Sequence, residues 1–96
     1  MTPEQVTNGL TDAAKRTIDD WISGKHCIKI EKGQSVTWSG GTFAAHPLIA
    51  FGGDTPSPIT KTTSGTSKSF TFPTEGVYGY VCELHSNMKG AIWVVP

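Results

Sequence analysis

The sequence predicts an all-β sandwich, because short alternating segments recur with turn residues between them. β-Branched or aromatic residues repeat with period two in residues 27–30, 35–38, 67–72, 76–82 and 91–95. Glycine and proline mark turns at 31–34 and 73–76, and a Gly/Pro/Ser/Thr-rich stretch at 52–66 predicts a long crossing loop. With 96 residues the chain has room for one domain, residues 1–96.

The first 25 residues fit two interpretations. Apolar residues recur at helical spacing between residues 14 and 22, behind Thr11 as a candidate N-cap, which predicts a short N-terminal helix. Ile18, Asp20 and Ile22 also alternate, which predicts an additional strand. The pattern leaves both open.

Charge and hydropathy exclude several classes of protein. Eight basic residues balance eight acidic ones and no like-charge run occurs, so a nucleic-acid partner is not expected. The longest apolar stretch, residues 43–51, contains His46 and is too short to span a membrane. The N-terminus lacks an export signal. We therefore expect a soluble chain whose signal, if the protein is exported, has already been removed.

A group of metal-ligand side chains follows the fourth predicted strand. Cys82 ends that strand, on the same face as two tyrosines, and His85 and Met88 follow at intervals of three in the loop 83–90. Successive tight turns can gather side chains at this spacing around one point. Thiolate, imidazole and thioether are soft donors that suit copper, and His46, held on extended backbone by Pro47, is the candidate second imidazole. The third histidine, His26, has no ligand partner nearby and is interpreted as a surface residue.

Each of these residues taken alone has an ordinary structural explanation, and a mononuclear copper site has three alternatives. A disulfide between Cys27 and Cys82 would staple a small domain. A hydrolase with Cys82 as nucleophile and His85 as base lacks an orienting Asn or Asp. A binuclear copper site would need a second cysteine in the loop. The combination of residues favours a mononuclear site, and no enzymatic activity is expected.

The segment Gly-x-Tyr-x-Tyr-x-Cys, the loop Cys-x-x-His-x-x-Met and the hydrophobic last strand together resemble the cupredoxins, the type 1 blue copper proteins. The short loop is similar to that of amicyanin, and residues 27–48 look like bacterial plastocyanin-like domains. The likeness covers residues 27–96, whereas residues 1–25 match poorly. Relatives with a cysteine at the position of Cys27 often pair it with one near the N-terminus, which this chain lacks.

This resemblance implies a Greek-key β-sandwich that binds one copper ion and shuttles electrons between redox proteins. It makes His46 and His85 the imidazole ligands, Cys82 the thiolate ligand and Met88 the axial ligand. It also implies a monomeric periplasmic or otherwise extracytoplasmic protein, with His85 as the electron port. Redox partners would dock transiently on an apolar patch around His85, for which the expected residues are Pro47, Leu48, Leu84 and Met88. Copper storage or delivery with the same ligands is the alternative function.

Overall fold

The computed structural model describes residues 6–19, 27–39 and 41–96. Within these ranges almost all regular structure is β-strand, and the one helix is a short 3₁₀ turn, η2. The elements, in chain order, are β1 (Thr7–Asn8), η2 (Ala13–Arg16), β2 (Thr17–Ile18), β3 (Cys27–Glu31), β4 (Ser35–Ser39), β5 (Leu48–Gly53), β6 (Ser67–Thr71), β7 (Gly76–Cys82) and β8 (His85–Val95).

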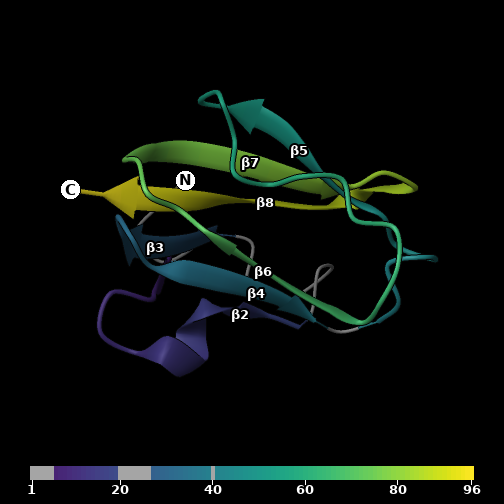
Figure 1. Cartoon of the computed structure of the whole chain (residues 1–96), viewed down its shortest axis with the longest axis horizontal. Coiled ribbons are helices and arrows are strands. Elements are labelled where there is room, and N and C mark those ends of the chain that lie inside the picture. The colour runs from purple at the N-terminus through teal and green to yellow at the C-terminus, as the bar shows by residue number, and fades with distance from the viewer. Residues whose placement is uncertain (1–5, 20–26, 40) are drawn as a thin grey trace.

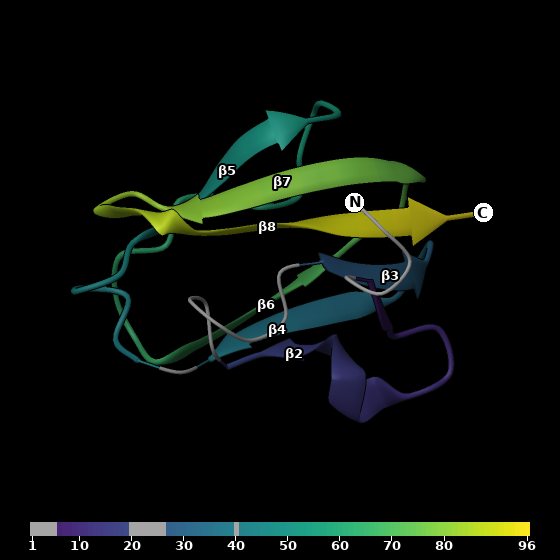
Figure 2. The ribbon, with the colours of Figure 1, turned by 180° about the vertical axis from the view of Figure 1, so that it is seen from behind.

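The strands form two sheets that pack face to face (Figure 1). The larger sheet has the order β1-β3-β8-β7-β5, and the smaller has the order β2-β4-β6. In the larger sheet β3 runs parallel to β8, whereas β7 is antiparallel to both β8 and β5. The view from behind shows the same two layers (Figure 2). The all-β sandwich predicted from the sequence is therefore confirmed.

The space between the sheets is filled by aromatic and β-branched side chains. Trp38, on β4, is fully buried and makes edge contacts with Phe70 at 5.7 Å and Tyr80 at 5.2 Å between ring centroids. Phe72 lies 6.5 Å from Trp38 and 5.6 Å from Tyr78. These five rings form the aromatic core that the sequence indicates, and such edge-to-face pairs add to the burial energy. Tyr80 carries this core to within two residues of Cys82.

Near the N-terminus each interpretation of the sequence is correct in part. Asp12, not Thr11, caps η2, because its Oδ1 accepts a hydrogen bond of 3.0 Å from the Ala14 amide. The helix is a single 3₁₀ turn, and β2 follows it directly and pairs in parallel with β4. The remainder of the proposed helix or strand, residues 20–22, lies outside the described residues, as does His26.

Strand β5 was not expected from the sequence. It begins at Leu48, within the apolar segment 43–51, and ends at Gly53, within the predicted loop 52–66. After Ile49 its residues are exposed, and its register against β7 shifts between Ala50 and Gly53. β5 is a bulged edge strand, and its residues do not alternate between buried and exposed. The sequence therefore has no period-two pattern that predicts this strand.

The final strand also begins earlier than predicted. β8 starts at His85, not at Ala91, so only Glu83 and Leu84 form the turn after Cys82. Cys82 pairs with His85, while the preceding Val81 pairs with Lys89. Residues 86–88 are therefore extra on β8, and the expected open loop is a tight hairpin carrying a bulge. Its polar sequence does not resemble a strand, but the pairing with β7 determines its conformation.

Both cysteines are free and buried, so the alternative of a disulfide between Cys27 and Cys82 is wrong. Cys27 opens β3, where it pairs with Ala91 of β8, and Cys82 closes β7. The turn at 31–34 is present: the Gln34 amide donates to Glu31 at 3.1 Å, and Gly33 has φ of 93°. None of the helices in the described ranges is long and apolar enough to span a membrane.

Candidate metal centre

Two segments that are far apart in the sequence meet at one end of the sandwich. The hairpin between β7 and β8 carries Cys82 and His85, and the segment that leads into β5 carries His46; both lie at the right-hand end of Figure 1. Leu48 pairs with Cys82 in the sheet, and the Glu83 amide donates a hydrogen bond of 2.8 Å to the Pro47 carbonyl. Sheet pairing thus fixes the two segments side by side.

Cys82 is presented by the most buried strand of the larger sheet. Tyr78, Tyr80 and Cys82 alternate on one face of β7, and all three are buried between the sheets. The Cys82 side chain is only 1% exposed. Burial also raises the pKa of Tyr80 well above its ordinary value, so this neighbouring phenol stays neutral. The thiol therefore lies in a rigid apolar environment at the end of the core.

His46 is held by a tight turn anchored on a buried aromatic residue. The amides of Ala45 and His46 both donate to the Thr42 carbonyl, at 3.2 and 3.0 Å. Phe43, within this turn, is buried, and its amide donates to the Gly65 carbonyl at 3.0 Å. The imidazole of His46 is half-buried as a result.

His85, by contrast, is exposed at the first position of β8. Its main chain pairs with Cys82 across the two-residue turn, which brings the imidazole next to the thiol. The order of exposure, with His85 more open than His46, agrees with the expectation from the sequence.

The donor atoms of these three side chains converge. The Sγ atom of Cys82 lies 3.8 Å from Nδ1 of His46 and 3.5 Å from Nδ1 of His85. The two imidazole rings are 5.0 Å apart, and each of the three residues offers a donor within 4.8 Å of the others. Bonds of about 2.0 Å to nitrogen and about 2.3 Å to sulfur, as at zinc sites, separate two donors by about 3.7 Å at an angle of 120°. The observed separations therefore fit three ligands of one ion.

Met88, the fourth residue predicted from the sequence, lies in the bulge at the start of β8. Its side chain is 5% exposed and belongs to the same buried cluster as Cys82 and Phe43. The next residue, Lys89, pairs with Val81 beside Cys82, so the backbone of Met88 lies at the same end of the sandwich as Cys82 and His85.

The apolar docking patch expected from the sequence is wrong in three of its four residues. Pro47, Leu48 and Met88 are buried and offer no surface to a partner. Only Leu84, at 63% exposure in the turn beside His85, projects into solvent. Pairing of β5 with β7 places Leu48 against Cys82, and Met88, in the bulge of β8, belongs to the buried core.

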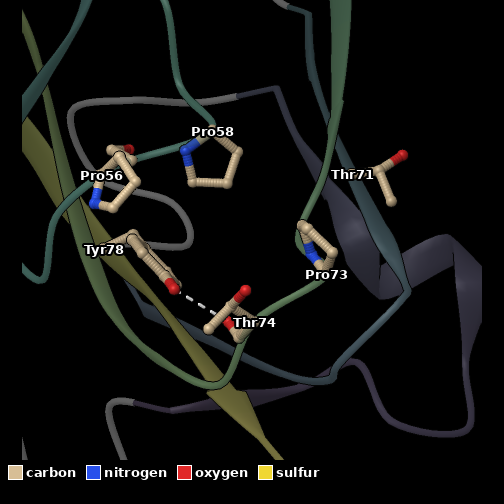
Figure 3. A pocket seen from close by; sticks show the side chains of 7 residues that line it. Pro56, Pro58, Thr71, Pro73, Thr74 and Tyr78 are labelled. Carbon is tan, nitrogen blue, oxygen red and sulfur yellow. Dashed lines mark hydrogen bonds between the residues drawn. The ribbon is translucent and has the colours of Figure 1, made fainter.

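A hollow of about 290 Å³ lies near the turn between β6 and β7 (Figure 3). This turn is at the opposite end of the sandwich from the β7–β8 hairpin (Figure 1). Pro56, Pro58 and Pro73 form much of its wall. The Tyr78 hydroxyl at its edge donates to the Thr74 carbonyl at 2.9 Å. The Ser57 hydroxyl likewise accepts from the Ile59 amide. Its lining is mainly apolar.

The residues that support the three converging side chains are not predicted by the sequence. Thr42 and Phe43 shape the turn of His46, and Lys61, from the crossing loop, forms an ion pair of 3.3 Å with Glu83. No motif marks these residues, because their roles depend on which loops the sheet brings together.

A β-sandwich that gathers a buried thiol and two imidazoles at one end defines a metal-binding protein with a soft donor set, of the kind that copper prefers. The family model of copper-binding proteins of the plastocyanin/azurin family matches residues 23–95. The chain therefore belongs to this family, the cupredoxins, and its cofactor is one copper ion.

Solved structures show the same fold at low identity. The copper-containing nitrite reductase from Thermus scotoductus is 20% identical with a TM-score of 0.66; the match covers 97% of this chain but 28% of the reductase chain. A purple cupredoxin from Nitrosopumilus maritimus is 18% identical, covering 94% of this chain and 98% of its own, with a TM-score of 0.57. Amicyanin from Paracoccus versutus is 22% identical with a TM-score of 0.51, and the match covers 73% of this chain and 69% of the amicyanin chain. A comparison with curated protein sequences found no match.

Proposed function

We propose that this protein is a one-electron carrier whose single copper ion is held by His46, Cys82, His85 and Met88. The observation that carries this proposal is the convergence of the Cys82 thiol with two imidazole nitrogens, at 3.5 and 3.8 Å, on a packed β scaffold. Membership of the plastocyanin/azurin family supports copper as the ion. Met88 is the weak axial ligand in this proposal, because it is buried and its neighbour Lys89 pairs with Val81, next to Cys82.

Bound copper supplies a one-electron couple between Cu(I) and Cu(II). The protein's part is to keep the ligands in place during that change, since ligand movement would slow electron transfer. Strand pairing fixes Cys82 against Leu48 and His85, and the turn at Thr42 fixes His46. Cys82 is only 1% exposed, which limits the access of water to the sulfur.

The exposed imidazole of His85 gives the electron its path to the surface. Leu84 stands next to it as the exposed apolar contact, and a small apolar contact suits the brief encounters of redox partners. The protein works in this proposal as a monomeric domain spanning residues 1–96. It catalyses no reaction, meets its redox partners in the periplasm or another extracytoplasmic space, and binds no nucleic acid.

Repeated reduction and reoxidation of the copper-loaded protein, in the presence of a Cu(I) chelator, tests the proposal. We expect reversible one-electron cycles with no loss of metal, since all the proposed ligands stay in place in both states. Transfer of copper to the chelator during the reduced phase would instead support copper storage or delivery. Electron exchange with a small inorganic oxidant should be fast in the same sample.

A further inference from the structure

The turn that joins two of the ligands carries a negative charge. Glu83 follows Cys82 directly and is separated from His85 by Leu84 alone. Its carboxylate Oε1 lies 3.3 Å from Nζ of Lys61, and the two side chains are 41% and 58% exposed. Its backbone amide donates 2.8 Å to the carbonyl of Pro47, the residue after His46. Glu83 therefore touches both ligand-bearing segments.

Lys61 reaches Glu83 from a third segment, the crossing loop between β5 and β6. The next residue, Thr62, is fixed to Leu48 by two backbone hydrogen bonds. The Leu48 amide donates to the Thr62 carbonyl at 3.0 Å, and the Thr62 amide donates to the Leu48 carbonyl at 2.9 Å. Leu48 in turn pairs with Cys82. Backbone hydrogen bonds therefore place Lys61 beside the turn that follows Cys82. Its ion pair with Glu83 links the crossing loop to the two segments that carry His46 and Cys82.

We propose that Lys61 is a positioning residue for the copper centre, acting through Glu83. It holds the Glu83 turn against the His46 segment and offsets the carboxylate charge of the turn that joins two of the proposed ligands. This inference rests on the proposed function, because it assumes copper bound at His46, Cys82 and His85. An unpaired carboxylate favours the more positive Cu(II), so pairing with Lys61 raises the reduction potential.

The pair should matter for the site far more than for the fold. Exposed ion pairs contribute little to global stability, so unfolding midpoints of Lys61 and Glu83 variants should stay close to that of the wild type. Changes in the reduction potential and in the hydrogen-exchange rate of the Glu83 amide would then report on the Lys61–Glu83 ion pair.

The first measurement compares Lys61→Met with Lys32→Met in the diamagnetic Cu(I) protein. Lys32 is exposed in the turn between β3 and β4, and this turn is at the opposite end of the sandwich from the β7–β8 hairpin (Figure 1). Lys32→Met is the control, because it removes the same charge far from the site. Hydrogen exchange followed by NMR should show the Glu83 amide, bonded to Pro47, exchanging about threefold or more faster in Lys61→Met. In Lys32→Met its rate should stay at the wild-type value.

The second measurement is the reduction potential at low ionic strength. Lys61→Met should shift the ratio of Cu(II) to Cu(I) affinity by about threefold to tenfold toward Cu(II), and Glu83→Gln should shift it toward Cu(I). In a Glu83→Gln background, Lys61→Met should have a clearly smaller effect, because the lysine has lost the group through which it acts. Salt at about 1 M should reduce both shifts.

The inference requires both results. It is overturned if the Glu83 amide exchanges no faster in Lys61→Met than in Lys32→Met, or if Lys61→Met leaves the reduction potential at the wild-type value. An equal effect of Lys61→Met with and without Glu83 also overturns it, since Lys61 would then act only as a distant charge. Failure of the proposed function is seen separately, because the wild-type protein would then show no reversible copper couple at all.

Discussion

Replacing Cys82 by serine should abolish the intense visible colour of the copper-loaded protein. The colour is expected from charge transfer between the Cys82 thiolate and Cu(II), and a serine hydroxyl cannot provide this transition. Serine is nearly isosteric with cysteine, so the variant should still fold, and its unfolding midpoint measures the cost of placing a hydroxyl at this buried position. Absorption spectra recorded after addition of one equivalent of Cu(II) measure the effect directly.

Cys27 provides the matched control. It is the second cysteine of the chain, it is also free and buried, and it opens β3 away from the three converging donors. Cys27→Ser should keep the full visible band per bound copper. A coloured Cys82→Ser protein, or a colourless Cys27→Ser protein that still binds Cu(II), would contradict the assignment of the thiolate.

Replacing Met88 by leucine should keep the copper and the colour but raise the reduction potential. Removing a weak axial donor disfavours Cu(II) relative to Cu(I), while Cys82 and the two histidines still hold the ion. A tenfold change in this preference corresponds to about 59 mV for a one-electron couple, and we expect a rise of that order. Leucine has a volume close to that of methionine, so the buried cluster should tolerate it.

Voltammetry of Met88→Leu and the wild type under the same conditions checks this expectation, with copper content and the unfolding midpoint as controls. An unchanged potential in a folded, copper-loaded variant would show that Met88 only packs. Loss of copper from a folded variant would instead make Met88 a principal ligand, in disagreement with its weak axial role.

The strands whose large apolar residues stand at alternate positions could be predicted from the sequence. Residues 35–38 and 76–82 show why: this spacing places Trp38, Tyr78 and Tyr80 in the core, and the structure confirms β4 and β7 there, although in β7 the residues between them are buried too. Strand β5 could not be found in this way, because it is mostly exposed and bulged after Ile49. The early start of β8 at His85 depends on pairing with β7, which no local pattern contains.

For the site, local spacing placed Cys82, His85 and Met88 near one another, and the structure brings Cys82 and His85 together across a two-residue turn. The contact with His46 is non-local and depends on the pairing of Leu48 with Cys82. The resemblance to cupredoxins supports His46 as the second imidazole ligand, which sequence spacing alone could not do. The burial of Pro47 and Leu48 and the Lys61–Glu83 pair arise from tertiary packing, and local sequence patterns do not show them.

Titration of the reduced, metal-free protein with Cu(II), followed by visible absorption and electron paramagnetic resonance, tests the central claim most directly. We expect the intense band to grow linearly and stop at one copper per chain, with the narrow copper hyperfine splitting of a covalent thiolate site. Uptake of Cu(II) without the band, or with a splitting typical of nitrogen and oxygen ligands alone, would contradict a centre built on His46, Cys82 and His85.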